Sequence, residues 1–196
     1  ACILRGQRQA GLQPGQSVLV IGSGIAGLLH IQLAKALGAG RIIATDISEY
    51  RMNAALRFGA DAVINATDDV PSRVRELNDN RLVDVVILCA GATTAIEQGL
   101  KSVERCGSVL FFAPTNKGVT IPFSINDTFW RNEITLTSSY AGSPADHATA
   151  LELIRAKRVN VNDMITHRLG LGDTGKGFQM VVDAQDSLKV IIEPQR

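Results

Sequence analysis

The chain has 196 residues, of which 45% are hydrophobic and 20% are charged, and its formal net charge is +1. This composition supports a packed core and excludes an intrinsically disordered chain. No basic run alternates with aromatic residues, so we expect no nucleic acid partner. The longest apolar stretches, such as Val83–Ala90, are far too short to span a bilayer, so we expect no membrane partner either.

The three cysteines are Cys2, Cys89 and Cys106. Their odd number and their spacing fit neither a metal knuckle nor a CxxC pair. We interpret them as reduced thiols of a cytoplasmic protein. Cys89 and Cys106 are expected to be inert thiols of the core.

The chain opens at Ala1 inside a segment of helical character that no capping residue precedes. We therefore expect a piece cut from a longer polypeptide, with a processed or tagged chain as the alternative. Strands and helices then alternate. The strands are expected at Val18–Ile21, Arg41–Asp46, Ala62–Ile64, Val83–Cys89, Gly107–Phe112 and Glu133–Ser139. The helices between them are expected at Ile25–Leu37, Glu49–Phe58, Asp69–Asn78 and Thr93–Glu104.

This alternation with short connections predicts an α/β fold with a doubly wound, parallel, six-stranded sheet of Rossmann type. Right-handed crossovers give the strand order 3-2-1-4-5-6. Residues Val119–Asn132 carry only a short amphipathic piece, Asn126–Arg131. After the sixth strand we expect a helix, a strand, a helix and a strand at Pro144–Arg158, Met164–Leu169, Thr174–Asp183 and Leu188–Ile192.

A glycine motif, GxGxxG, directly follows the first strand and opens a helix. Gly22 permits a tight turn, Gly24 lets the backbone approach a pyrophosphate, and Gly27 lets the helix pack on the strand. The helix N-terminus would face the phosphates with free N–H groups and its positive dipole end. Ser23, Ile25 and Ala26 complete this candidate phosphate-binding turn. The motif alone is also compatible with mere packing in an apolar, glycine-rich chain.

An acid ends the second strand, because Asp46 follows Gly27 at the distance typical of a dinucleotide-binding unit. Its carboxylate can accept hydrogen bonds from the adenosine ribose and would repel a 2′-phosphate, which favours NAD over NADP. Arg51 could reach the ribose or a 2′-phosphate and weakens that preference slightly. The alternative is that Asp46 only caps the next helix.

Small residues end the fourth and fifth strands, in Cys89-Ala90-Gly91 and in Phe112-Ala113. At the carboxyl ends of parallel strands they leave room for a ligand, here the nicotinamide half of the cofactor. Ordinary strand-to-helix punctuation would look the same at any single position.

With these residues in place, the chain resembles the medium-chain dehydrogenase/reductase family, and within it the zinc-dependent alcohol, sorbitol and threonine dehydrogenases. The similarity runs over nearly the whole chain. The matching segments are Ala10–Gly15, Gly22–Gly27, Leu33–Ala39, Phe58–Asp61, Val83–Val86, Gly107–Leu110, Ile165–Arg168 and Ser187–Val190.

The resemblance implies roles for individual residues. Asp46 would bind the adenosine ribose, with Ile47 and Arg51 nearby. It also implies a dinucleotide-binding domain at residues 1–160, and a segment at 161–196 that packs on it and leads toward a catalytic domain outside this chain. The remaining implied contacts are Cys89, Ala90, Gly91, Phe112 and Ala113 along the nicotinamide, Ser139 and Tyr140 beside its amide, and Lys189 near the pyrophosphate.

The catalytic zinc of that family is held by Cys, His and a carboxylate of an N-terminal domain, and none of those motifs occurs here. We therefore expect no metal ligand and no catalytic residue in this chain. His167 is interpreted as a structural or interdomain residue, His30 as a partly buried core or surface residue, and His147 as solvated.

The sequence thus predicts the NAD(H)-binding domain of an oxidoreductase that moves hydride between an alcohol or polyol and NAD. Zinc would assist in the full-length enzyme, and this chain alone would be inactive. The alternatives are a zinc-free quinone or enoyl reductase using NADPH, a non-catalytic nucleotide-binding module, and a methyltransferase using S-adenosylmethionine. The sheet edge Glu133–Ser139 is expected to pair with a second copy, unless Val119–Ile125 covers it. The resemblance implies a homodimer or homotetramer.

Overall fold

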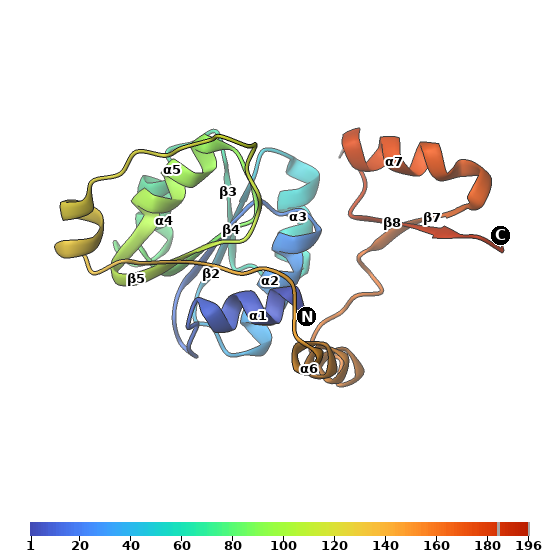
Figure 1. Ribbon diagram of the computed structural model, residues 1–196, viewed down its shortest axis with the longest axis horizontal. Coiled ribbons are helices and arrows are strands. Elements are labelled where there is room, and N and C mark those ends of the chain that lie inside the picture. The colour runs from blue at the N-terminus through green and yellow to red at the C-terminus, as the bar shows by residue number, and fades with distance from the viewer. Residues whose placement is uncertain (184, 196) are drawn as a thin grey trace.

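A parallel sheet forms the centre of the molecule (Figure 1). The computed structural model describes residues 1–183 and 185–195, and six strands of this described part make up the sheet. Across the sheet they run β3-β2-β1-β4-β5-β6, and every neighbouring pair is parallel, which confirms the predicted doubly wound order. Their bounds are β1 (Val18–Ile21), β2 (Ile42–Asp46), β3 (Ala62–Asn65), β4 (Val83–Leu88), β5 (Val103–Phe111) and β6 (Thr135–Ser138).

Helices cover both faces of this sheet. Residues of α2 and α3 pack into the buried cluster on one face, and residues of α4 and α5 pack into the cluster on the other. In the described part of the chain, no helix is both long enough and apolar enough to cross a bilayer. The bounds are α1 (Cys2–Gln9), which lies beside α2, then α2 (Ile25–Ala36), α3 (Glu49–Arg57), α4 (Val70–Leu77) and α5 (Thr93–Ser102).

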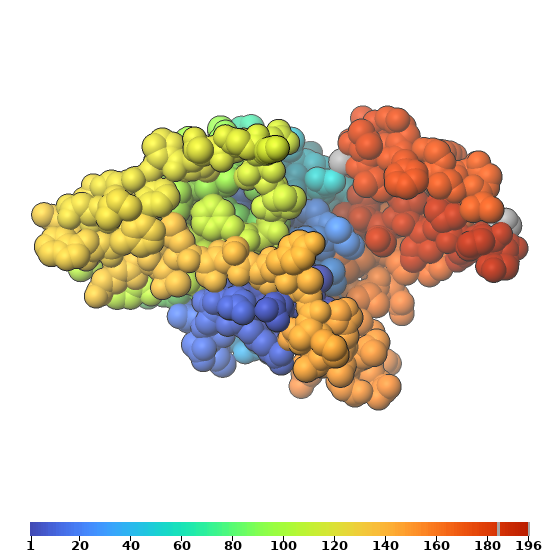
Figure 2. Space-filling model, in the orientation of Figure 1, coloured from blue at the N-terminus to red at the C-terminus, as the bar shows by residue number. Residues whose placement is uncertain are grey.

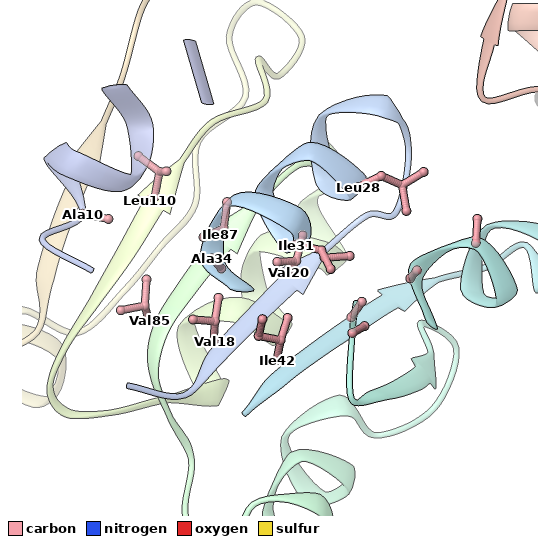
Figure 3. Close-up of a cluster of buried hydrophobic side chains, with 14 of the residues drawn as sticks. Ala10, Val18, Val20, Leu28, Ile31, Ala34, Ile42, Val85, Ile87 and Leu110 are labelled. Carbon is pink, nitrogen blue, oxygen red and sulfur yellow. The ribbon is translucent and has the colours of Figure 1, made fainter. Parts of the chain in front are cut away.

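The central strand β1 shows why the sheet is buried on both sides. Val18 and Val20 belong to the first cluster and Leu19 and Ile21 to the second, and none of the four is more than 1% exposed. Because side chains alternate along a strand, a continuous apolar run fills both layers at once. Figure 3 shows the first cluster, where side chains of the strands meet those of α2.

The boundary between α5 and β5 differs from the prediction. The helix ends at Ser102 and the strand begins at Val103, whereas the sequence predicted a longer helix and a strand from Gly107. Val103 pairs with Val83 of β4, and the pairing then shifts its register, with Cys106 at a φ of 61°. Such a bulge leaves residues outside the hydrogen-bond ladder. The polar residues between Val103 and Ser108 therefore lack the sequence pattern of a regular strand.

Two more elements are shorter than predicted by three residues each, and a left-handed residue lies at one end of both. Helix α6 (Pro144–Arg155) stops before Arg158 because Lys157 adopts a φ of 55°, as residues that terminate helices commonly do. Strand β6 starts after Glu133, whose φ is 52°. The segment before it contains a π-helical turn, η1 (Asn126–Trp130), where the sequence predicted only a short amphipathic piece.

Asp146 connects the first helix to α6. It forms a capping box with Ser143 at the start of α6, and Arg8 of α1 donates a hydrogen bond of 2.8 Å to its Oδ1. Hydrogen bonds from the Ser143 backbone and hydroxyl, and then the charge of Arg8, lower the pKa of the Asp146 carboxyl. The carboxylate therefore remains charged and holds the two helices together.

The C-terminal residues form a lobe of their own at one end of the molecule (Figures 1 and 2). Strands β7 (Ile165–Gly170) and β8 (Lys189–Glu193) make a second parallel pair, connected by η2 (Leu171–Asp173) and α7 (Thr174–Asp183). Two buried residues, Met164 and Leu188, belong to the first core cluster and tie the lobe to the main body.

Candidate functional site

A groove lies where the carboxyl ends of β1, β2 and β4 meet, at the point where the strand order reverses. In open α/β sheets this crevice is the usual place for a ligand. Its volume of about 680 Å³ falls within the range of small-molecule and cofactor sites. It is lined by Ile21, Gly22, Gly24, Thr45, Asp46, Ile47, Arg51, Ala66, Thr67, Cys89, Ala90, Ala92, Thr94, Ala95 and Gln98.

The glycine turn between β1 and α2 forms one wall of the groove. Gly22 has a φ of 96°, which glycine adopts without strain. A Cβ on Gly27 would stand 1.9 Å from the Gly22 carbonyl oxygen, so helix and turn approach as closely as only glycine allows. A Cβ on Gly24 would meet no described atom within 4 Å, and the backbone there is open to the groove.

The start of α2 suits an anion. Gly24 is its N-cap, with no side-chain hydrogen bond to the cap and no acid in the first turn. The first N–H groups of a helix have no partner within it, and the macrodipole places partial positive charge there. The turn therefore offers backbone donors and a favourable field to a diphosphate.

Asp46 is locked to the glycine turn. The residue is 6% exposed, and its Oδ2 accepts a hydrogen bond of 2.8 Å from the Ser23 backbone N–H. Its Oδ1 accepts another of 2.9 Å from the Ser48 backbone N–H. Each carboxylate oxygen can still accept a further bond, so the group is oriented and retains acceptors for a ligand.

The structure also bears on the alternative that Asp46 only caps the next helix. Ser48 is the N-cap of α3, and its hydroxyl accepts from the Arg51 N–H. Asp46 lies two residues before that cap, at the end of β2, and lines the groove.

Ile47 and Arg51 stand beside the acid, and both line the groove. Ile47 is 76% exposed and offers an apolar side chain to the groove. The buried Nε of Arg51 has no hydrogen-bond partner among the described residues, and no ion pair with Asp46 is present there. The guanidinium is therefore not neutralised by the neighbouring carboxylate.

The candidate residues of the nicotinamide side divide into two groups. Cys89 and Ala90 line the groove with Asp46. Gly91 instead contacts the chain after β5, where an added Cβ would stand 2.2 Å from the Pro114 carbonyl oxygen. The remaining nicotinamide-side candidates do not line this groove: they are Phe112 and Ala113 after β5, and Ser139 and Tyr140 after β6. Some phosphate-side candidates do not line it either: these are Lys189 in the C-terminal lobe, and Ser23, Ile25, Ala26 and Gly27 within the turn.

The groove residues that escaped the sequence analysis include Ala66 and Thr67 after β3, and Thr94 and Gln98 on α5. No motif marks them. The rule that residues after parallel strands gather at one edge could have found the first two, because β3 precedes them directly.

The histidines include one correction. His30 is completely buried, not partly buried or at the surface. Its ring packs edge-on against that of Phe112, with the two ring centroids 4.6 Å apart. Burial lowers the pKa of His30 to about 3, so the ring is neutral. His147 is exposed, as predicted, and His167 is half-buried with Nδ1 bonded to the Thr166 hydroxyl.

The cysteines include another correction. Cys106 is exposed in the β5 bulge, so its assignment to the core was wrong. Its Sγ lies 3.4 Å from Glu133, whose hydrogen bond raises the pKa of the thiol. Cys89 packs against the first core cluster, and burial raises the pKa of its thiol, so it stays protonated.

Comparison with known proteins identifies the family. Residues 26–156 match the zinc-binding dehydrogenases. The chain belongs to this family. A zinc-type alcohol dehydrogenase-like protein of Escherichia coli is 34% identical over 190 residues, which make up 94% of this chain and 52% of that protein. The sorbitol dehydrogenase of Halalkalibacterium halodurans is 30% identical over 201 residues, covering 99% and 56%.

A solved structure has the same fold. A Sinorhizobium meliloti protein described as a zinc-binding dehydrogenase, bound to NADP, has a TM-score of 0.88 at 25% identity and covers 98% of this chain. This chain corresponds to 56% of that protein. It thus spans about half the length of its relatives.

The described residues contain no set of ligands for zinc, the metal after which the family is named. Within residues 1–183 and 185–195, no three His, Cys, Asp or Glu side chains lie close enough together to hold an ion. The described residues therefore offer no zinc site built from three such side chains.

The second and third glycines of the turn should respond differently to an added methyl group. Gly27→Ala forces a Cβ against the Gly22 carbonyl and should lower the free energy of unfolding by about 1–3 kcal/mol. Gly24→Ala, the matched control, has open space and a φ of −70°, so its stability should stay within about 1 kcal/mol of the parent. Urea unfolding measures both. Equal stability of the two variants would contradict the described packing of the turn.

Proposed function

We propose that this chain binds NAD(H) for an oxidoreductase that moves hydride between an alcohol or polyol CH–OH group and NAD. One observation carries the proposal: the Ser23 N–H bonds to Asp46 Oδ2, which joins a glycine turn open to a diphosphate with an acid suited to a ribose diol. The family and the name of the sorbitol dehydrogenase relative support an alcohol or polyol as substrate.

Two charged residues decide between NAD and NADP. A 2′-phosphate would stand beside the Asp46 carboxylate, whose charge repels it. Arg51 on the same wall is not paired with that acid and would attract the phosphate. Since Asp46 would contact the 2′-hydroxyl itself, we propose a preference for NAD that Arg51 reduces but does not reverse. The Sinorhizobium meliloti structure holds NADP, so that protein of the same fold accommodates a 2′-phosphate.

The chain's own contribution is to bind and orient the cofactor, and we do not expect turnover from it alone. When bound, zinc would act as a Lewis acid that lowers the pKa of the substrate hydroxyl. We propose that its ligands lie outside these residues. A zinc-free quinone or enoyl reductase using NADPH is the second candidate, and Asp46 argues against it. A non-catalytic nucleotide-binding module remains the third.

We also propose how the chain is organised. Residues 1–160 would form the dinucleotide-binding domain, and residues 161–196 would pack on it and face a catalytic domain. The exposed apolar residues of α7, Phe178, Val181 and Val182, support a covered surface there. We propose a cytoplasmic location, which suits three cysteines that form no disulfide in the described chain.

We propose that two copies associate through the edge strand β6. Among the described residues it pairs only with β5, and no backbone hydrogen bond there connects residues 119–125 to it. That segment therefore does not extend the sheet. Ile125 and Trp130, which precede β6, are 67% and 74% exposed and add apolar surface beside the open edge.

The cofactor proposal predicts that the parent chain binds NADH more tightly than NADPH. Asp46→Ala removes charge-assisted acceptors, so NADH affinity should fall about 10- to 100-fold while NADPH loses far less. Isothermal calorimetry measures both. Asp61→Ala is the matched control, since Asp61 also accepts from a backbone N–H, that of Ile42, but at the opposite end of β2. An unchanged NADH affinity in Asp46→Ala, or a parent that prefers NADPH, would overturn the proposal.

Association through β6 predicts that the parent sediments as a dimer or larger oligomer. Charging the apolar surface with Ile125→Lys and Trp130→Lys together should give monomers, whereas Phe178→Lys in the C-terminal lobe should not. Sedimentation velocity distinguishes these states. A monomeric parent, or a double variant with the parent's sedimentation coefficient, would count against this edge.

A further inference from the structure

The groove continues past Asp46 to a polar end that the cofactor proposal leaves without a role. Ile47 borders this end, together with Ala66 and Thr67 after β3 and Thr94 and Gln98 on α5. In a nucleotide, the ribose carbon that carries the 2′-hydroxyl is bonded to the carbon that carries the base. A diol held by Asp46 therefore brings the base into the immediate neighbourhood of that residue.

Two hydrogen bonds place Gln98 in that neighbourhood. The Ala66 backbone N–H donates to the Asp46 carbonyl oxygen at 3.0 Å. The Ala66 carbonyl oxygen in turn accepts from Gln98 Nε2 at 3.1 Å. One peptide residue thus separates the glutamine amide from the strand end that bears the acid.

These contacts also fix which way the amide of Gln98 faces. Its Nε2 donates to the carbonyl oxygens of Ala66 and Asp68, at 3.1 and 3.4 Å. Carbonyl oxygens only accept, so the NH₂ group must point to them. The oxygen Oε1 lies on the other side of the amide and has no hydrogen bond among the described residues. Oε1 can therefore accept a hydrogen bond from a ligand.

The other polar groups at this end cannot discriminate in the same way. The Thr67 hydroxyl donates to Asn65 Oδ1 and can still accept, and the exposed Thr94 hydroxyl can rotate to donate or accept. Gln98 Oε1 can only accept. An acceptor held in one orientation favours a base that presents a donor and disfavours one that presents a second acceptor.

We propose that Gln98 is a specificity-determining residue that selects a 6-aminopurine, adenine, over a 6-oxopurine in the bound dinucleotide. This inference rests on the proposed binding of NAD(H). The amino group of adenine donates to Oε1, while the exposed face of Ile47 offers apolar contact to the ring. Hypoxanthine presents a carbonyl oxygen at the same ring position and leaves two acceptors facing each other.

The test compares NADH with its hypoxanthine analogue by calorimetry on the 196-residue chain. The parent should bind NADH roughly 5- to 20-fold more tightly, the usual effect of one hydrogen bond lost with its partner left unpaired. Gln98→Met removes the acceptor at similar length, so the ratio of the two affinities should fall to about one, mainly through weaker NADH binding. Glu97→Met, on the neighbouring exposed position of α5, should keep the parent ratio.

A second variant protects the test against a folding defect. Gln98→Glu loses the two donated bonds but keeps an acceptor, which the carbonyls of Ala66 and Asp68 repel toward the groove, so the preference for adenine should persist. A parent that binds both dinucleotides equally, or a Gln98→Met variant with the parent ratio, would overturn the inference and leave NAD(H) binding intact. A parent that binds neither would overturn the proposed function as well.

Discussion

The hydrogen bond from the Ser23 backbone N–H to the Asp46 carboxylate joins the two halves of the candidate site. Ser23 lies in the turn that leaves β1, and Asp46 is the last residue of β2, the strand paired directly with β1. The bond removes freedom from the turn and rotational freedom from the acid. The turn and the Asp46 side chain are ordered when the chain folds. A ligand that contacts both therefore loses little binding free energy to ordering them.

That bond depends on the rigid sheet beneath it. β1 and β2 are buried along their whole length, and their parallel register places the turn and the acid at one edge. The contact of Gly27 with Gly22 then sets the entry of α2, so that its N-terminus points at the same crevice. Each element contributes backbone geometry, and we propose that the polar side chains of Asp46, Arg51 and Gln98 distinguish one nucleotide from another.

Much of the fold could be predicted because apolar runs and glycines report directly on burial and turns. The run Val83–Leu88 has no alternation, since helices cover both faces of β4, and it was correctly assigned. The bulge at Cys106 and the helix stop at Lys157 could not be predicted, because a left-handed φ at a non-glycine residue is imposed by tertiary packing.

The candidate site likewise divides into residues that could be predicted from the sequence and residues that could not. The glycine turn and Asp46 lie within one βαβ unit, so their spacing along the chain is informative. Gln98 comes from α5, far away in sequence, and lines the groove with its amide bonded to the loop after β3. Gly91 was interpreted as room for a ligand, and the structure shows that contact with Pro114 is reason enough for a glycine there.

The central claim is that the backbone of the turn holds a diphosphate while Asp46 holds the sugar beside it. The most direct measurement is an NADH titration of the ¹⁵N-labelled chain followed through its amide resonances. We predict saturable shifts that are largest for the N–H groups of Gly24, Ile25, Ala26 and Gly27, together with those of Ser23 and Ser48, whose N–H groups bond to Asp46. Saturable NADH binding that leaves these resonances unmoved and shifts amides elsewhere would contradict the claim.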